Sequence, residues 1–339
     1  MSRWADDPEG AADALIARSL DDIAIEGALL AVNQGGSLPA RLEERGLGPS
    51  LWNRRLAMGW PAAPWPPPGP FDLALVRLPK TRDEQAMTLH ATLGILGARG
   101  RLVLYGGNDE GIRSAAQTLE ELCGVVETLA VRGHGRVLAV RPPQSTGELR
   151  STLASWRLES QLEIAGGTRP WVSYPGTFAA GRLDEGTALL VSVLPALPGG
   201  ARVLDYGCGT GEITAAALAL QPALAVDALD NDAVALEAAR ENVPAARLVL
   251  ADRLRDAGRR DYHALLSNPP LHQGIAESHA MLERLVAEAP SHLRPGGLLQ
   301  MVVQRRLPLE RLLALNFARV EVVAETGRYR IWRAYTERR

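Results

Sequence analysis

Three glycines at alternate positions form the stretch whose residue types most clearly indicate chemistry. They are Gly207, Gly209 and Gly211 in Asp205-Tyr-Gly-Cys-Gly-Thr-Gly211, which follows a short apolar run and precedes an Ala/Leu-rich one. Glycine permits positive φ and lets a ligand approach the backbone, and the start of a helix offers unpaired N–H groups. The pattern predicts a strand, a tight loop and a helix that bind a nucleotide-like ligand, with Cys208 as a small residue that fits the loop.

The acid before this loop indicates which ligand is bound. A dinucleotide-binding loop reads G-x-G-x-x-G, whereas this loop reads G-x-G-x-G with Asp205 two residues before the first glycine. A carboxylate at that point repels a pyrophosphate and attracts a cation such as the α-ammonium group of a methionine moiety. The sequence therefore favours S-adenosylmethionine over NAD.

Two further acids close the next two predicted strands. Asp230 ends an apolar run and is expected to bind both hydroxyls of a ribose. Asp252 ends the following run, and its carboxylate is expected to accept a hydrogen bond from the adenine amino group. The neighbours Asn231 and Arg253 complete the expected cofactor site. Three successive strands that end in acids favour a cofactor site over a plain doubly wound core.

An Asn-Pro-Pro sequence follows the fourth strand of this series. Pro269 and Pro270 fix φ and disfavour helix in the residues before them, so the chain should leave the sheet extended. The side-chain oxygen of Asn268 and the carbonyl oxygen of Pro269 would then accept both hydrogens of a planar –NH₂ group, and Asn268 is also expected to contact the cofactor. Two such acceptors orient a poorly nucleophilic amine for attack on a sulfonium methyl. An isolated Asn-Pro pair is commonly only a turn.

These segments resemble those of the bacterial small-subunit (16S) rRNA guanine-N2 methyltransferases, which are class I S-adenosylmethionine-dependent enzymes with an Asn-Pro-Pro motif. The resemblance covers nearly the whole chain. It implies guanine N2 as the methyl acceptor and 16S rRNA or the assembled small subunit as the substrate. The matching segments are Tyr174-Pro-Gly-Thr-Phe178, Leu183-Asp-Glu-Gly-Thr187, Val203-Leu-Asp-Tyr-Gly-Cys-Gly-Thr-Gly211, Ser267-Asn-Pro-Pro-Leu-His-Gln-Gly274 and Glu325-Thr-Gly-Arg-Tyr-Arg330.

One position departs from the pattern of this family. The residue after the two prolines is usually aromatic and would stack on the target base, but here it is Leu271. We expect His272 or Phe178 to supply the flat surface, or Leu271 to wedge the base. A base edge inside a duplex is out of reach, so the target guanine must be unpaired or flipped.

The composition is that of an ordinary soluble protein with room for two domains. The chain has 339 residues, of which 46% are hydrophobic and 22% charged. No apolar run approaches the length of a membrane span and the N-terminus lacks a signal-peptide core, so we expect a cytoplasmic protein, without membrane contact and monomeric. The two cysteines, Cys123 and Cys208, indicate neither a disulfide framework nor a metal site.

The net charge of −2 argues mildly against a nucleic-acid binder. Almost all the positive charge is arginine, however, with Lys80 the only lysine, and arginine pairs bidentately with phosphate and stacks on bases. Each arginine cluster is about as typical of a solvated surface. The clusters are Arg253, Arg255, Arg259 and Arg260, then Arg305 and Arg306, then the run from Arg328 to Arg339.

The first half of the chain repeats the order of the second. Two tandem Rossmann-like α/β methyltransferase domains are therefore predicted, each with a mostly parallel sheet that ends in an antiparallel hairpin. They span 1–143 and 156–339, joined by a linker within 141–155. The segments aligned are 72–79 with 262–269, 98–105 with 294–301, and 126–140 with 320–334.

The first copy is predicted to be degenerate. In the alignment Leu78 replaces Asn268, and Asn33-Gln-Gly-Gly-Ser37 stands where the glycine loop would be. This domain should bind neither cofactor nor target amine, and should serve substrate recognition or stability. Other predicted elements are a helix at 9–20, a strand at 25–32, a Pro/Trp-rich surface loop at 52–70, a hairpin at 156–174 that turns at Gly166-Gly167, and a helix at 276–293.

Two other classes of function fit the same residues. N-methylation of a protein glutamine amide, or of adenine in DNA, would present the same –NH₂ group to Asn268. A non-catalytic RNA-binding or ribosome-assembly protein would also retain a cofactor pocket.

Overall fold

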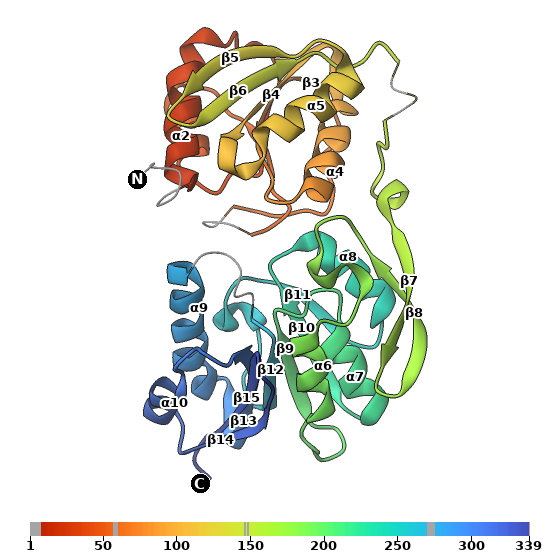
Figure 1. The fold of residues 1–339 in the computed structure, drawn as a ribbon, viewed down its shortest axis with the longest axis vertical. Helices are drawn as coiled ribbons and strands as arrows, with labels where there is room; N and C mark the ends of the chain where they lie inside the picture. The colour runs from red at the N-terminus through yellow and green to blue at the C-terminus, as the bar shows by residue number, and fades with distance from the viewer. Residues whose placement is uncertain (1–7, 57–59, 146, 148, 270–274, 339) are drawn as a thin grey trace. The chain divides into compact units, whose positions relative to one another are not determined.

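The chain folds into two compact units, residues 1–157 and 158–339 (Figure 1). Both are α/β domains built on one mostly parallel sheet, which is the predicted fold class. In the described part of the chain, none of the helices has both the length and the apolar character that crossing a bilayer requires. The computed structural model describes residues 8–338 except 57–59, 146, 148 and 270–274.

The first unit carries a six-stranded sheet in its described residues, with the order β2-β1-β3-β4-β6-β5. Strands β2, β1, β3 and β4 are parallel, and the β5–β6 hairpin closes the sheet antiparallel to β4. Its elements are α2 (Pro8–Ser19), η1 (Leu20–Asp22), β1 (Leu29–Val32), α3 (Leu38–Glu44), β2 (Ser50–Trp52), β3 (Phe71–Arg77), α4 (Arg82–Leu93), β4 (Leu96–Gly107), η2 (Asn108–Glu110), α5 (Ile112–Cys123), β5 (Glu127–Arg132), β6 (Gly135–Val140) and η4 (Leu153–Trp156).

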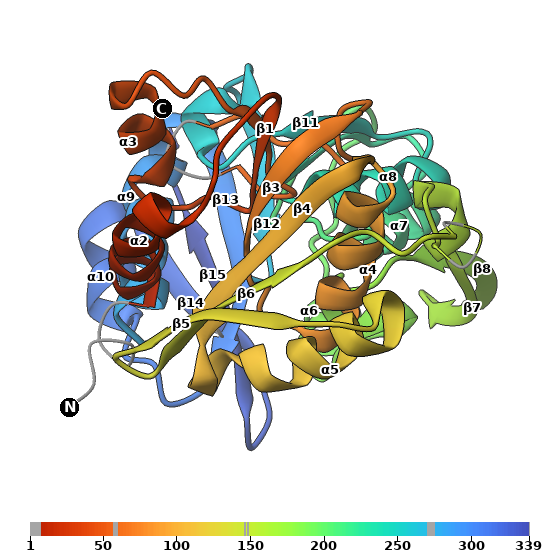
Figure 2. The ribbon, with the colours of Figure 1, turned by 90° about the horizontal axis from the view of Figure 1, so that it is seen from above.

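Helices cover both faces of this sheet (Figure 2). Leu15 and Ile16 of α2 and Leu42 of α3 pack in one buried cluster with alternate residues of the strands. Leu89 of α4 and Leu119 of α5 pack in a second cluster with the intervening strand residues. A parallel sheet buried on both faces requires such near-continuous apolar strands.

The second unit repeats this plan with one more strand, in the order β11-β10-β9-β12-β13-β15-β14 for the described residues. A separate antiparallel pair, β7–β8, precedes it. The elements are β7 (Leu158–Ile164), β8 (Gly167–Ser173), η5 (Phe178–Gly181), α6 (Glu185–Ser192), β9 (Arg202–Tyr206), α7 (Glu212–Leu220), β10 (Ala225–Asp230), α8 (Ala233–Asn242), β11 (Arg247–Leu250), η6 (Leu254–Ala257), β12 (Tyr262–Ser267), α9 (Ile275–Glu288), η7 (Ala289–Ser291), β13 (Leu293–Gln304), α10 (Glu310–Asn316), β14 (Arg319–Glu325) and β15 (Tyr329–Tyr335).

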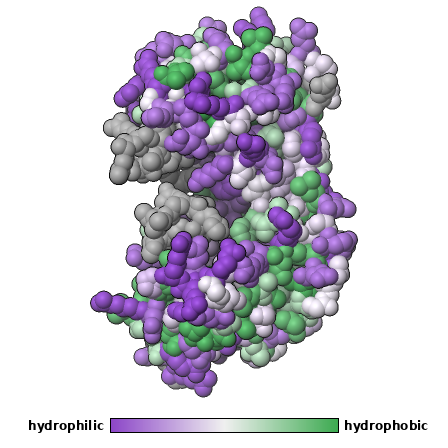
Figure 3. Space-filling model, viewed as in Figure 1, coloured by the Kyte–Doolittle hydropathy of each residue, from purple (hydrophilic) through white to green (hydrophobic). Residues whose placement is uncertain are grey.

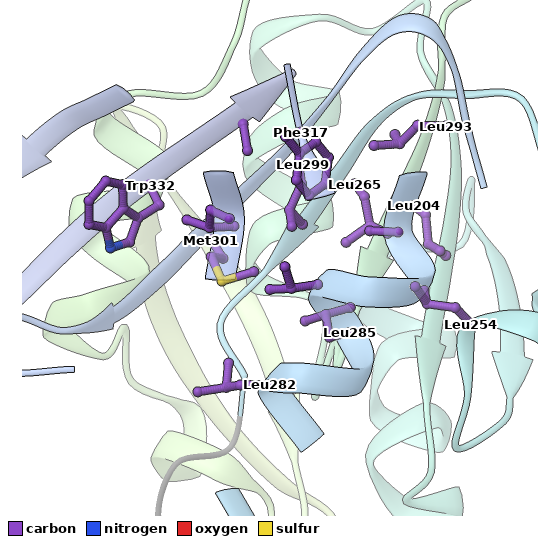
Figure 4. Close-up of a cluster of buried hydrophobic side chains, with 14 of the residues drawn as sticks. Leu204, Leu254, Leu265, Leu282, Leu285, Leu293, Leu299, Met301, Phe317 and Trp332 are labelled. Carbon is purple, nitrogen blue, oxygen red and sulfur yellow. The ribbon is translucent and has the colours of Figure 1, made fainter. Parts of the chain in front are cut away.

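The core of this unit has two layers, one on each face of the sheet. On one face Leu265 of β12 and Met301 of β13 pack with Leu282 and Leu285 of α9 (Figure 4). On the other face α6 and α7 pack against the alternate strand residues, such as Leu266. The side-chain period of two along each strand thus decides which helix each residue meets.

Strand pairing confirms the predicted repeat and corrects its alignment. Ala74 pairs with Leu102 in the first sheet, as Leu265 pairs with Leu299 in the second. Both β3–β4 and β12–β13 carry a register shift at the matching position, and the two closing hairpins share register throughout. The predicted alignment of β3 and β4 was therefore wrong by one residue, whereas that of the hairpins was right.

This shift changes which residue replaces Asn268 in the first copy. Ser267 pairs with Met301 and its counterpart Val76 pairs with Leu104, so the next residue, Arg77, occupies the place of Asn268. The prediction of Leu78 was wrong. The alignment by sequence similarity was off by one residue. Such a slip moves every side chain to the opposite face of the strand, and it therefore assigned the wrong counterpart to Asn268.

Three other predictions need correction. Trp52 lies at the end of β2 and is only 4% exposed, and its indole N–H donates to the carbonyl of Ala63 at 3.1 Å, so 52–70 is not simply a surface loop. The first strand begins at Leu29 rather than 25, since Gly27 has a φ of +73°. Helix α9 ends at Glu288, and short helices α3 and α10 were not predicted.

Candidate functional site

The glycine loop between β9 and α7 has the predicted backbone. Gly207, Gly209 and Gly211 have φ of +72°, +56° and +103°. A Cβ on Gly211 would lie 2.9 Å from Cγ2 of Val243, whereas no described atom lies within 4 Å of a Cβ on Gly207. Gly211 is therefore needed for packing, and Gly207 faces open space that a side chain would partly fill.

The end of β10 holds this loop in place. The N–H groups of Gly207 and Cys208 both donate to the carbonyl of Leu229, at 2.8 and 2.9 Å. The N–H of Gly209 donates to Oδ2 of Asp230 at 2.8 Å, and Oδ1 of the same carboxylate accepts from the N–H of Asp232 at 2.9 Å. The predicted ribose-binding acid thus also shapes the loop beside it.

Asp205 lies beneath the loop and is fully buried. Its Oδ2 accepts hydrogen bonds from the N–H and hydroxyl of Thr214, at 3.0 and 2.7 Å. Its Oδ1 is also buried and has no hydrogen-bond partner among the described atoms. Burial raises the pKa of this carboxyl to about 7. An unpaired buried carboxylate oxygen is costly, so this atom suits a cationic donor.

The residues predicted to bind adenine follow β11 at the same edge of the sheet. Asn231 donates from Nδ2 to Oδ1 of Asp252 at 3.3 Å, and the hydroxyl of Tyr206 donates to the backbone carbonyl of Asp252 at 2.9 Å. Arg253 is half-buried and directly precedes η6, without a capping hydrogen bond from its side chain. The structure therefore brings Asp205, the loop and the acids after β10 and β11 together around the carboxyl ends of three adjacent strands.

The amide of Asn268 is held in one orientation. Its Nδ2 donates to Oγ1 of Thr187 at 2.8 Å and to Oδ2 of Asp184 at 3.3 Å. An ionised carboxylate only accepts, so the –NH₂ group must face Asp184. Among the described residues none donates to the side-chain oxygen of Asn268, which leaves this oxygen available to accept a hydrogen bond from a ligand.

Asp184 reaches Asn268 because it caps α6. Its Oδ2 also accepts from the N–H groups of Gly186 and Thr187, at 2.9 and 3.2 Å. Such a cap typically contributes about 1 kcal/mol to stability. Sequence reasoning quoted the segment Leu183 to Thr187 but assigned these two side chains no role, although an acid before a helix is a recognisable cap signal.

The remaining predicted residues are only partly described. Pro269 is buried, while Pro270, Leu271 and His272 lie outside the described residues. Phe178 begins η5 and is 45% exposed, which agrees with a side chain that could meet a ligand rather than with a core aromatic. Across the described residues, no three His, Cys, Asp or Glu side chains are grouped to hold a metal ion.

A further polar chain, which sequence reasoning missed, supports the loop from below. The indole N–H of Trp171 donates to Oγ1 of Thr210 at 3.0 Å, and this hydroxyl donates to Oε1 of Glu212 at 2.6 Å. Burial raises the pKa of the Glu212 carboxyl to about 7. Trp171 comes from β8, so nothing in the local sequence of the loop indicates it.

Two family models match the chain. The methyltransferase small domain matches residues 170–333, and its N-terminal domain matches residues 59–134. A ribosomal RNA small subunit methyltransferase C of Pseudomonas aeruginosa is 36% identical over 272 residues, which are 79% of this chain and 80% of the relative. The namesake of Shewanella pealeana is 31% identical over 266 residues, 77% and 76% of the two chains.

The chain belongs to the ribosomal RNA small subunit methyltransferase C family. A solved structure of the T. thermophilus 16S rRNA N2 G1207 methyltransferase, in complex with AdoMet and guanosine, has a TM-score of 0.81. That match covers 96% of this chain and 92% of the other, at 22% identity, and it shows that the two share a fold. The family and the fold therefore agree with the predicted architecture of two tandem Rossmann-like methyltransferase domains.

Proposed function

We propose that this protein transfers a methyl group from S-adenosylmethionine to the exocyclic N2 of a guanine in 16S rRNA. The observation that carries the proposal is the fixed amide of Asn268, whose oxygen receives no hydrogen bond from any described residue and could accept one from an –NH₂ group. Family membership supports the reaction class and the rRNA substrate. The T. thermophilus protein, whose name specifies guanine N2 and whose structure contains AdoMet and guanosine, supports the cofactor and the acceptor.

The residues of the glycine loop fit this cofactor. The unpaired Oδ1 of Asp205 is available to the methionine ammonium, either directly or through a water, and the open space at Gly207 allows close approach to the backbone. Asp230 and Asp252 would take the ribose hydroxyls and the adenine amino group, with Asn231 and Arg253 beside them. S-adenosylmethionine supplies an electrophilic sulfonium methyl when it is bound.

Asn268 and Pro269 would hold the acceptor amine. Their two oxygens each accept one N–H hydrogen, which turns the nitrogen lone pair out of conjugation and towards the methyl donor. The amine proton becomes acidic only after the methyl is attached, so no strong base is required. Asp184 and Thr187 act as positioning residues, because they fix which end of the Asn268 amide faces the amine.

The target base needs a flat or apolar contact as well. Phe178 is the described candidate, since much of its side chain is accessible. Leu271 and His272, which follow Pro270, stay predictions. A protein that acts on rRNA would work in the cytoplasm, and we propose that it does so as a monomer without a metal ion.

The test uses labelled S-adenosylmethionine with three acceptors: small ribosomal subunits, naked 16S rRNA, and a protein with an accessible glutamine. We expect label in rRNA, at a guanine that is unmodified in cells lacking this protein. Label in protein alone would overturn the rRNA assignment. Cofactor binding without methylation of any RNA would favour the non-catalytic reading instead.

A further inference from the structure

An arginine-rich pocket lies where β13 ends and the β14–β15 hairpin turns. Its volume is about 330 Å³. Two arginine clusters that are separate in the sequence meet there, because Gln304 at the end of β13 pairs with Tyr329 at the start of β15. The lining residues are Gln304, Arg305, Arg306, Gly327, Arg328 and Tyr329.

The pocket carries more positive than negative charge. Arg305 pairs with Glu325 at 2.9 Å and Arg328 with Glu185 at 2.9 Å. Arg306 donates from Nε to the side-chain oxygen of Gln304 at 3.0 Å, and no carboxylate pairs with it in the described part of the chain. Glu325 also pairs with Arg330, so four guanidinium groups share two carboxylates here, and an anion would balance the remaining charge.

Several contacts connect this pocket to the Asn268 site. Glu185, the partner of Arg328, is the first residue of α6 and follows Asp184, which holds the Asn268 amide. The ring of Tyr329 lies against the same turn, since a Cβ on Gly186 would be 3.3 Å from its Cε1. The strands that lead to the two places, β12 and β13, are parallel neighbours and end at the same edge of the sheet.

We propose that this pocket binds a backbone phosphate of the RNA, next to the nucleotide whose amine Asn268 holds. Guanidinium groups recognise phosphate oxygens bidentately, and Arg328 can exchange its exposed pairing with Glu185 for a stronger one. Hydrophilic side chains also gather at the margin of the C-terminal unit on the side of α9, with apolar patches beside them (Figure 3). The inference rests on the proposed function, because it names a second part of the same substrate.

The test compares Arg306→Gln with Arg311→Gln. Arg311 is an exposed arginine on α10, five residues further on, and has no ion pair within the described ranges, so it is a matched control. The probe is a short single-stranded 16S rRNA fragment, bound at several salt concentrations without cofactor. We expect Arg306→Gln to weaken binding about 5- to 10-fold near 0.1 M salt, and to reduce the slope of log K against log salt by about 0.7. Arg311→Gln should change neither.

A charge-reversing substitution tests the same site a second time. Arg306→Glu should weaken RNA binding more than Arg306→Gln, with an unchanged thermal midpoint for both. Equal affinities and salt slopes for wild type, Arg306→Gln and Arg311→Gln would overturn the phosphate site. An acidic peptide serves as a second probe. If Arg306→Gln lost affinity for this peptide but kept its affinity for RNA, the phosphate site would also be overturned.

The outcomes separate this inference from the proposed function. If the wild type methylates rRNA but Arg306→Gln binds it normally, the phosphate site is refuted alone. If binding depends on Arg306 as expected but the wild type methylates no RNA, the proposed reaction is refuted and the phosphate site stands.

Discussion

The two sheets share a pairing pattern but differ at the positions where chemistry is expected. Ala31 in β1 occupies the place that Asp205 has in β9, and Asn53 occupies the place of Asp230. These counterparts follow from strand register, which alternating apolar residues on both faces enforce. The buried strand pattern therefore specifies the fold, while a few residues at the strand ends decide whether a site exists.

The loops after β1 and β9 differ in where their polar side chains lie. Asn33 has a φ of +56° and donates to the carbonyl of Trp52 at 2.9 Å, as Gly207 does to the carbonyl of Leu229. The side chain of the next residue, Gln34, is however buried: its amide donates to the carbonyl of Val32 at 2.7 Å and its oxygen accepts from the hydroxyl of Tyr105 at 2.6 Å. The Gln34 side chain thus makes its hydrogen bonds inside the first domain, although Nδ2 of Asn33 in the same loop is buried without a partner among the described atoms. In the second domain, no described residue donates to Oδ1 of Asp205 or to the side-chain oxygen of Asn268.

The largest expected effect is on Asn268. In Asn268→Ala the acceptor oxygen is lost, and we expect the turnover number to fall about 10²- to 10³-fold, as when one preorganised hydrogen-bonding group is removed from an active site. Single-turnover methylation of rRNA measures this directly. Binding of S-adenosylmethionine and the thermal midpoint should change little. Turnover within a few-fold of wild type would refute the assigned role.

The counterpart residue, Arg77, should behave in the opposite way. Its side chain is 4% exposed and its Nη1 donates to Oε2 of Glu110 at 3.0 Å, as part of a two-point ion pair. In Arg77→Met the carboxylate loses this partner, and we expect the first unit to lose about 3 kcal/mol of unfolding free energy. Urea denaturation measures this loss, and limited proteolysis at each urea concentration shows that it is the first unit that unfolds.

Methylation by the folded fraction of Arg77→Met should stay normal. This outcome would show that the same register position is structural in one sheet and functional in the other. A loss of turnover in fully folded protein would contradict it, and would give the first domain a direct part in the reaction.

Gly100 and Gly297 occupy matching positions in the two sheets, and they test whether the two register shifts have the same cause. A Cβ on Gly100 would lie 2.9 Å from the carbonyl oxygen of Gly97 and 3.0 Å from that of Phe71. A Cβ on Gly297 would lie 2.9 Å from the carbonyl oxygen of Arg294 and 3.0 Å from that of Tyr262. Gly100→Ala should therefore lower the free energy of unfolding of the first unit by about 2 kcal/mol, and Gly297→Ala should lower that of the second unit by about the same amount.

Denaturation of the two glycine variants should show the same loss in different transitions. Gly46→Ala is a poor control because its φ is +75°, but Gly48→Ala is suitable, since neither a positive φ nor any described atom within 4 Å opposes a Cβ there. If only one of the two variants lowered the free energy of unfolding, the matched register shifts in the two sheets would not have the same origin.

Much of this fold could be predicted because its signals are local. Alternate glycines, an acid before them and an Asn-Pro-Pro sequence each lie within a few residues, and the structure gives the three glycines the positive φ expected. The contacts that orient Asn268 could not be derived in this way, because Asp184 and Thr187 are more than eighty residues away in sequence. Only the topology brings α6 to the end of β12.

The misplaced counterpart of Asn268 has a similar cause. Both copies read as apolar runs that end in proline, so a one-residue slip preserves the apparent similarity. Hydrogen-bond register removes this ambiguity, because Val76 and Ser267 face equivalent partners in the neighbouring strand. A sequence with continuous apolar strands, buried on both faces, lacks the alternation that would have fixed the register.

The smallest expected effect concerns the proton on Asp205. Because burial raises its pKa to about 7, the free folded protein holds this proton at lower pH. A bound ammonium group favours the ionised carboxylate, so binding below the pKa must release the proton. The affinity for S-adenosylmethionine should therefore rise up to about tenfold per pH unit as pH increases towards 7, and level off above it. Calorimetry between about pH 6 and pH 8 measures this dependence.

Asp205→Asn and Glu212→Gln separate the two buried acids that titrate in this range. Asp205→Asn should abolish the pH dependence and weaken binding, whereas Glu212→Gln should keep the dependence, because its partner is the Thr210 hydroxyl. The sign of the stability effect provides an independent check. The folded state binds more protons than the unfolded state between about pH 4 and pH 7, so the cofactor-free protein should lose stability as pH rises across that window. A free energy of unfolding that rises with pH over the same window, and rises equally in Asp205→Asn, would contradict this. It would mean that Asp205 is ionised throughout the window, and that its counterpart in the first sheet, Ala31, stands where the second sheet has a permanently charged group.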